Sequence, residues 1–189
     1  MLERYGIVTR ETVLAEGVPG GFSSLYGELS NLEILGTARR GYFVEGLGGA
    51  QFALAGAVER LRGLPHREHE YLVLATTDPA QPYGASLPWP KRSEGRRPAR
   101  TAGAYVLLSH GNPIVYVERG GKGIVRLVEL EGEELVEAVT QLSEATREGV
   151  LPKLGIERVD GEPVFGSGLE EQIIAAGFSR QPRRLVATA

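Results

Sequence analysis

The fold at the start of the chain is decided by residues 9–54, which read TRETVLAEGVPGGFSSLYGELSNLEILGTARRGYFVEGLGGAQFAL. Apolar residues repeat at helical spacing over residues 22–35, and Gly36 supplies the position that follows a helix end. Thr9 is suited to cap a shorter helix over residues 9–16. The link between them, VPGG at 18–21, is typical of the tight turn of a helix-turn-helix.

Two β-like runs, residues 37–43 and 51–54, follow these helices and are separated by a glycine-rich segment. Two helices and a two-stranded wing predict a winged helix, which we assign to a domain over residues 1–65. A winged helix normally opens with a further helix, for which only residues 2–5 remain. We therefore expect an exposed apolar patch around Ile7, Val13 and Leu25, covered by self-association through residues 1–35 or by docking onto the rest of the chain.

The periodicity changes in residues 71–189, for which we predict a second domain. Runs rich in β-branched residues are separated by turn signals at Asn112 and at Gly120-Gly121, so a meander is expected. The expected strands are residues 71–76, 104–109, 113–118, 124–129, 156–159 and 184–187, and the expected helices are 131–148 and 169–176. The fold class predicted is α+β: an N-terminal winged helix, then an antiparallel β-barrel-like domain with peripheral helices.

Composition excludes several classes of protein. The absence of cysteine excludes disulfides, thiolate zinc sites and cysteine nucleophiles. His66 and His69 lack a third ligand nearby and fit a solvated linker better than a metal site, so neither metal nor cofactor is expected. No apolar run is long enough to span a bilayer, and the N-terminus does not resemble a secretory signal. We expect a cytoplasmic protein with no membrane partner.

Charge is unevenly distributed along the chain, whose net charge is −3. Residues 66–120 carry seven basic and five acidic side chains, whereas residues 121–189 carry eight and twelve. The middle is therefore basic and the C-terminal third acidic. Because the total is mildly negative, an assignment to nucleic acid has to rest on motifs.

Several long strings resemble one family. They are RYGIVTR at 4–10, VPGGF at 18–22, RRGYFVEGLGGAQFA at 39–53, ATTDPAQPYGASLPWP at 75–90 and YVERGGK at 116–122. Together they resemble the C-terminal region of large helicase-related (Lhr) proteins. The resemblance implies a bacterial superfamily 2 DNA helicase, in which two RecA-like motor domains precede winged-helix and β-barrel modules. The long forms end in winged helices and a barrel similar to the AlkZ-like DNA glycosylases.

The phosphate-binding loop of such a motor is absent from this sequence. GGKG at 120–123 lacks the first glycine of the motif and the final Ser or Thr. We therefore expect a nucleic-acid-binding accessory module of an Lhr-type helicase involved in DNA repair, with no ATPase activity. Its expected partners are single-stranded or forked DNA and the upstream helicase domains. Two alternatives stay open: a DNA base glycosylase that acts on damaged or deaminated bases, and a scaffold that docks other helicase domains through the acidic helix 131–148.

The candidate DNA contacts of the winged helix lie on its second helix and its wing. Ser23, Ser24 and Asn31 are the candidate contacts on the helix. The helix carries Glu28 and Glu33 and no Lys or Arg, which is unfavourable against a polyanion, so an architectural role is equally compatible. Arg39 and Arg40 begin the wing, where phosphate contact is common. A solvated edge strand is the alternative for them.

A proline-rich, basic excursion over residues 78–101 is a second candidate. Cations beside an aromatic ring suit single-stranded nucleic acid, because phosphates attract the charge and bases stack on the ring. The candidate residues are Trp89, Lys91, Arg92, Arg96, Arg97 and Arg100. The alternative is a solubilising loop with Trp89 packed inward. Arg119 and Lys122, which flank a predicted hairpin tip, could also contact nucleic acid or belong to an ordinary exposed hairpin.

Glycosylase chemistry requires a carboxylate that activates water or stabilises an oxocarbenium-like sugar. Asp78 and Glu118, each at the end of a predicted strand, are the candidate catalytic carboxylates, and Gln51 is a candidate polar orienter. Asp before Pro is more often a turn or cap residue, so a structural role for Asp78 is the stronger alternative.

Overall fold

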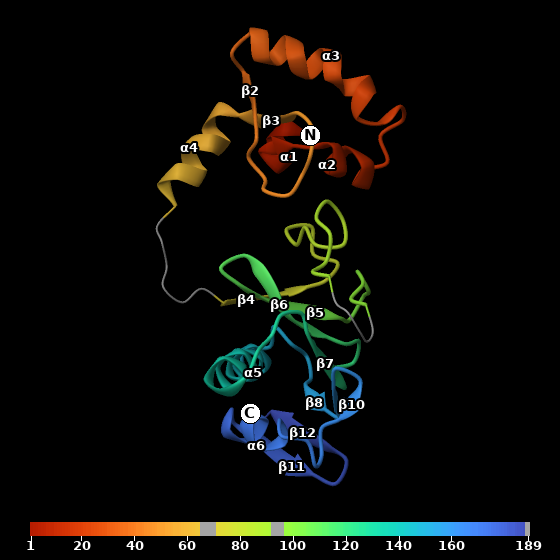
Figure 1. The fold of residues 1–189 in the computed structure, drawn as a ribbon, viewed down its shortest axis with the longest axis vertical. Coiled ribbons are helices and arrows are strands. Elements are labelled where there is room, and N and C mark those ends of the chain that lie inside the picture. The colour runs from red at the N-terminus through yellow and green to blue at the C-terminus, as the bar shows by residue number, and fades with distance from the viewer. Residues whose placement is uncertain (65–70, 92–96, 188–189) are drawn as a thin grey trace. The chain divides into compact units, whose positions relative to one another are not determined.

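A computed structural model describes residues 1–64, 71–91 and 97–187 of the chain (Figure 1). The chain divides into two compact units. The winged-helix unit contains Met1–Arg67 with Ala85–Leu87, and the sheet unit contains Glu68–Gly84 with Pro88–Ala189. His66 and His69 and the cations Arg92 and Arg96 lie outside the described residues.

The winged-helix unit has the predicted helix-turn-helix followed by a wing. Its helices are α1 (Leu2–Tyr5), α2 (Arg10–Ala15), α3 (Gly21–Ile34) and α4 (Ala55–Gly63), and its strands are β1 (Ile7–Val8), β2 (Ala38–Gly41) and β3 (Gln51–Leu54). The wing strands β2 and β3 pair antiparallel, and β1, which the sequence did not predict, pairs with the other edge of β3. The winged helix is thus confirmed, with a three-stranded sheet in the order β1-β3-β2.

Local hydrogen bonds explain where the two main helices begin and end. The Thr9 hydroxyl accepts from the Thr12 amide (3.2 Å), and the Thr12 hydroxyl accepts from the Thr9 amide (2.8 Å). This capping box satisfies two backbone donors that the first turn of α2 leaves unpaired. Gly36 has a φ of 76°, which glycine adopts without strain, and it ends α3 as predicted.

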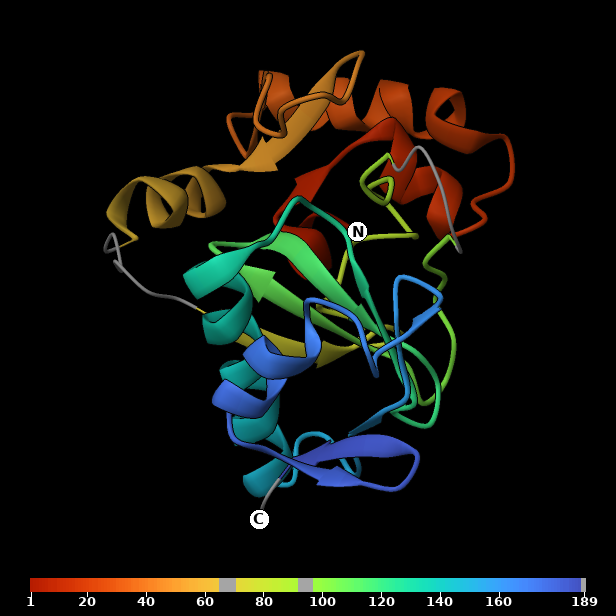
Figure 2. The ribbon, with the colours of Figure 1, turned by 60° about the horizontal axis from the view of Figure 1, so that its bottom comes forward.

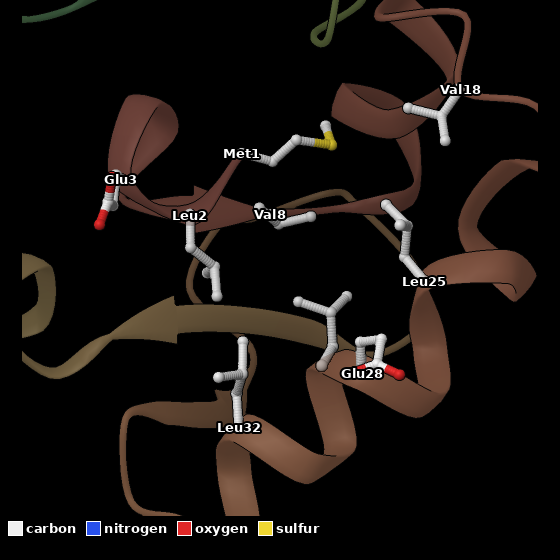
Figure 3. Close-up of a pocket in the computed structure, with 9 residues that line it drawn as sticks. Met1, Leu2, Glu3, Val8, Val18, Leu25, Glu28 and Leu32 are labelled. Carbon is white, nitrogen blue, oxygen red and sulfur yellow. The ribbon is translucent and has the colours of Figure 1, made fainter.

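The core of the winged-helix unit is small and leaves a groove open. Leu2, Val8, Val13, Leu29, Ala38 and Phe52 form the core. The prediction of exposure was wrong for Val13, which is fully buried, because α2 turns this residue inward. An apolar groove of about 450 Å³ does lie between α1, β1 and α3, with Leu25 and Leu32 among its lining residues and Glu28 at its rim (Figure 3).

The sheet unit is built on the predicted meander. Its strands are β4 (Tyr71–Ala75), β5 (Tyr105–Ser109), β6 (Asn112–Val117), β7 (Gly123–Arg126), β8 (Gly155–Ile156), β9 (Arg158–Val159), β10 (Glu162–Pro163), β11 (Phe178–Gln181) and β12 (Arg184–Ala187), and its helices are α5 (Gly132–Arg147) and α6 (Glu170–Ala175). Strands β4 to β7 pair antiparallel in sequence order, with the Gly120-Gly121 turn between β6 and β7.

Residues 156–159 do not form the single strand that the sequence predicted. They separate into β8, which pairs with β12 in a three-stranded sheet, and β9, which runs parallel to β7 in the larger sheet. The larger sheet has the order β10-β9-β7-β6-β5-β4, with β10 and β4 at its two ends. The sheet of the described residues is therefore open, and the closed barrel stays a prediction.

Helix α5 covers one face of the larger sheet (Figure 2) and provides much of the core. Its buried side chains recur at helical spacing, among them Leu135, Val139 and Leu142, and pack with Leu107, Val115 and other residues of the central strands. The opposite side of the helix carries its glutamates in solvent. No helix in the described part of the chain is long and apolar enough to cross a membrane.

Candidate nucleic-acid interface

Helix α3 presents only part of its predicted polar face for binding. Ser23 and Asn31 are exposed. The Ser24 hydroxyl is used within the turn, because it lies 3.0 Å from the Pro19 carbonyl oxygen and 2.8 Å from that of Gly21. The remaining exposed polar side chains of α3 are therefore the neutral Ser23 and Asn31 and the acidic Glu28, which a polyanion repels.

The two wing arginines are held by acidic and aromatic neighbours. The Arg40 Nε donates to the Glu33 carboxylate (2.9 Å) and its Nη1 to the Tyr26 hydroxyl (3.0 Å), and the guanidinium lies over the Phe52 ring (5.4 Å). The hydrogen bond to Glu33 raises the pKa of Arg40. Arg39 makes a longer ion pair with Glu59 (3.6 Å) and keeps half of its side chain in solvent. Of the two, Arg39 is the more accessible to a phosphate.

The basic excursion between β4 and β5 is tied together at its base. The Thr76 hydroxyl donates to the Thr101 carbonyl (2.9 Å) and accepts from the Thr101 amide (3.0 Å). Gln81, which is buried, donates through Nε2 to the carbonyls of Thr76 (3.1 Å) and Tyr83 (3.0 Å), and its Oε1 accepts from the Tyr83 amide. The predicted loop therefore has a fixed stem.

Trp89 packs inward at this stem. Its ring lies 6.0 Å from those of Tyr83 and Tyr116, and these aromatics join a cluster with Val106, Leu108 and other residues of the sheet. Burial raises the pKa of the Tyr83 phenol. Gly84 has a φ of 77°, and a Cβ there would collide with the indole nitrogen. Trp89 thus anchors the excursion and does not offer a free stacking face.

Three cations of the excursion are described by the structure. One of them is hydrogen-bonded to the backbone of the excursion, and the other two are exposed to solvent. The Arg100 guanidinium donates to the carbonyls of Gln81 and Asp78, the latter at 3.2 Å. Lys91 and Arg97 are exposed. The stem therefore holds Lys91 and Arg97 in solvent, where they could meet phosphates.

The turn between β6 and β7 carries the two candidate cations Arg119 and Lys122. Only one of them forms an ion pair with a described residue. Arg119 is exposed, whereas Lys122 lies 3.8 Å from Glu157 and keeps 62% of its side chain in solvent. Neighbouring Glu118 pairs with Arg158 (3.2 Å) and is largely buried. Both cations of the tip are accessible to a polyanion.

The two candidate catalytic carboxylates have structural partners. Asp78 Oδ1 accepts from the Ala80 amide (2.8 Å), which is the turn role that the sequence favoured. Glu118 faces Arg158 from below the hairpin tip. Gln51 is fully buried and bonds to the backbone of the wing, at Phe43, Val44 and Leu47. Among the described residues, no three His, Asp or Glu side chains come together as a metal site.

Sequence reasoning did not consider the cations Lys153, Arg183 and Arg184. They lie in the acidic C-terminal third, whose net charge concealed them. A residue-by-residue search of the predicted turns would have found Arg183 and Arg184, since they follow Pro182 at the turn into the last strand, β12, which begins at Arg184. Their proximity to Arg119 and Lys122 depends on pairing between distant strands, which the sequence does not reveal.

Comparisons with known proteins agree with the architecture. Residues 1–73 match the family model for the winged-helix domain of large helicase-related protein. The chain is 43% identical over 198 residues to "Lhr helicase/ probable uracil glycosylase" of Mycolicibacterium smegmatis, covering 98% of this chain and 13% of that protein. It is 39% identical over 192 residues to "Lhr helicase/uracil glycosylase" of Escherichia coli K12, covering 98% of this chain and 12% of that protein. The chain thus spans a small part of each relative.

Proposed function

We propose that this chain, which contains a winged-helix domain of the large helicase-related type, is a nucleic-acid-binding accessory module of a DNA helicase involved in DNA repair. The observation that carries the proposal is the helix-turn-helix and wing of residues 1–54, in a chain 43% identical to an Lhr helicase. The relatives' names supply the helicase context, and the winged helix supplies the expectation of DNA binding.

Within the module, the excursion is the better phosphate-binding element. Its stem fixes Lys91 and Arg97 in solvent, while the winged helix uses Arg40 internally and has no cation on α3. We therefore place the main electrostatic contact at the excursion and assign weaker, polar contacts to Ser23, Asn31 and Arg39. Single-stranded or forked DNA is the proposed ligand, because an irregular cationic loop follows a flexible backbone more readily than a rigid duplex.

The proposed partners are this DNA and the other domains of a longer helicase. The sequence holds no phosphate-binding loop, so the proposal assigns ATP hydrolysis to those other domains. The exposed glutamates of α5 are the surface we assign to docking such domains, as a scaffold would require. Location in the cytoplasm follows from the proposed role on DNA.

Titration with fluorescent single-stranded, duplex and forked DNA over a salt series tests the proposal. We expect weak binding, in the range of about 1 µM or above, with a clear salt dependence. Replacing Lys91 and Arg97 with Ala should lower the affinity and flatten the salt slope, and Arg147→Ala on α5 is a matched control. Absence of binding to all three DNA forms would refute the module, and unchanged binding by the Lys91/Arg97 variant would refute the role of the excursion.

A second candidate function, DNA base glycosylase, rests on the names of both relatives, which include uracil glycosylase. Its candidate carboxylates are Asp78, within a tight turn, and Glu118, paired with Arg158. Incubation with uracil-containing strands, followed by cleavage at abasic sites, tests it. Excision that disappears in Asp78→Asn or Glu118→Gln would establish this function, and the absence of abasic product would reject it for this chain alone.

A further inference from the structure

Charges in the C-terminal third of the chain are segregated on the sheet unit. The exposed glutamates belong to α5, whereas the cations belong to three other segments: the β6–β7 turn, the residues before β8, and the β11–β12 hairpin (Figure 1 shows these elements). The cations are Arg119, Lys122, Lys153, Arg183 and Arg184, and we call them the C-terminal basic surface. The segments that carry these cations are separated in sequence. The net negative charge of residues 121–189 therefore conceals all of them but Arg119.

Two glycines bring the three segments together. The Gly155 amide donates to the Gly121 carbonyl (2.8 Å), which joins the β6–β7 turn to the start of β8. A Cβ at Gly121 would collide with the Lys153 carbonyl oxygen. A Cβ at Gly155 would lie 3.0 Å from Cδ of Arg184, so the stem of this arginine crosses the glycine. The close approach of these backbones places Lys153 and Arg184 beside the turn.

The acidic side chains next to this surface do not neutralise it. Glu157 pairs with Lys122, and Glu118 pairs with Arg158, a further cation between the two segments. In the part of the chain that the structure describes, Arg119, Lys153 and Arg183 make no ion pair. All three are exposed. The surface therefore keeps an excess of positive charge.

A pocket of about 310 Å³ adjoins the basic surface and contains an aromatic ring. Phe165, Arg180, Gln181 and Pro182 line it. The Arg180 guanidinium lies over the Phe165 ring (5.2 Å) and pairs with the largely buried carboxylate of Glu170 (3.1 Å), so these two contacts orient a guanidinium whose side chain is mostly in solvent. Gln181 connects the pocket to the surface, because its Oε1 accepts from Arg184 Nε (3.2 Å).

We propose that the C-terminal basic surface and this pocket form a second binding site, for single-stranded nucleic acid. Phosphates contact the exposed cations, and one unpaired base enters the pocket and stacks on the exposed Arg180 guanidinium, which the Phe165 ring supports from its other side. A base within a duplex is stacked and paired and cannot enter, so the pocket selects for single strands. The inference rests on the proposed function, since it adds a second site to the same module.

Binding of a labelled oligothymidylate to the full chain, measured by fluorescence anisotropy over a salt series, tests this site. The double variant Arg183→Glu/Arg184→Glu should bind about tenfold more weakly at low salt, with a salt slope smaller by about 1.4 for two lost phosphate contacts. Phe165→Leu should weaken binding and leave the slope unchanged, because it removes the ring that orients the Arg180 guanidinium for stacking and removes no charge. Arg147→Glu, an exposed charge reversal on α5, is the control and should change little. Thermal melting confirms that each variant is folded, and Arg183→Glu alone replaces the double variant if that one is not.

The outcomes separate this site from the excursion. If the Arg183/Arg184 variant binds like the parent while the Lys91/Arg97 variant loses affinity, the second site is refuted and the proposed function stands. If the Arg183/Arg184 variant alone loses affinity, the second site stands and the excursion is refuted. If Phe165→Leu lowers the affinity for oligothymidylate and the affinity for duplex DNA by the same factor, the pocket does not select for single strands, and that part of the proposal is overturned. An absence of any binding by the parent would refute both.

Discussion

The winged-helix unit and the sheet unit use their cations in different ways. In the winged helix, Arg4 pairs with Glu16 and Arg40 with Glu33, so two of its arginines help to hold the unit together. In the sheet unit, Lys91, Arg97 and the C-terminal basic surface remain accessible to solvent. The motif that is typical of DNA binding is thus the less basic of the two surfaces. In this chain, the winged helix is the part that matches a family model, whereas the cations assigned to phosphate contact lie mainly in irregular segments of the sheet unit.

The units also differ in packing. The sheet unit has one large core in which α5 meets the central strands, whereas the winged-helix unit has a small core beside an open groove. The same substitution should therefore have different consequences in the two units.

Leu142→Ala should have the largest effect. Leu142 is fully buried between α5 and the sheet, and its truncation leaves a cavity that costs about 2–5 kcal/mol. Leu32→Ala, in the half-buried lining of the groove, should cost only about 1 kcal/mol. Hydrogen exchange of α5 and α3 amides measures both losses. Equal losses would contradict the difference in packing.

Gly84→Ala should come next. The added Cβ collides with Trp89 and forces a side chain into a φ of 77°, so we expect a loss of about 2 kcal/mol or more. The control in the winged-helix unit is Gly46→Ala, where φ is 75° but the space is open, and we expect about 1 kcal/mol. Because Trp89 is the chain's single tryptophan, its fluorescence reports the displacement. An unchanged emission spectrum in Gly84→Ala would show that the indole is not held there.

Arg40→Ala should have a smaller effect on stability and almost none on DNA. It removes a partly exposed ion pair and the contact with the Phe52 ring, and solvent screening keeps the contribution of both to stability small. Thermal melting measures this loss, and the salt slope of DNA binding should match that of the parent chain. A flattened slope would show that Arg40 leaves Glu33 to contact phosphate, and the contrast between the two units would fail.

The smallest effect is expected from pH. Glu16 accepts a hydrogen bond from the Tyr5 hydroxyl and pairs with Arg4, and chiefly the Tyr5 bond lowers its pKa below the ordinary 4.5. The ionised form is therefore favoured by folding, so its contribution is present above pH 4.5 and is lost as the pH falls through the lowered pKa. The melting temperature of the winged-helix unit should fall as the pH drops below 4.5. Glu16→Gln should remove the part of this fall that is due to Glu16. An identical acid profile in the variant would exclude Glu16 as its source.

Much of the fold could be predicted because its signals are local. Helical spacing and Thr9 predicted α2 and α3, and alternating β-branched runs predicted the meander. The sequence did not predict β1, which has two residues and depends on pairing with β3. It also merged β8 and β9, because a continuous run does not show that its halves join different sheets.

The candidate site was less predictable, since it depends on which partner each side chain finds. Arg40 meets Glu33 only because α3 and β2 fold back on each other, and Trp89 turns inward because Tyr83 and Tyr116 offer a cluster. The prolines on both sides of Trp89 did indicate that this side chain could pack inward. No comparable local signal marked Lys153 and Arg184 as neighbours.

The glutamates of α5 and the C-terminal basic surface give the sheet unit an electric dipole moment. In the field of a polyanion, such a body experiences a torque that turns its positive end forward before any atoms touch. Orientation is then partly completed during approach, which raises the association rate without adding a contact. If the module binds DNA as proposed, the acidic helix is repelled by the strand and turns away from it, and the basic surface then faces the strand.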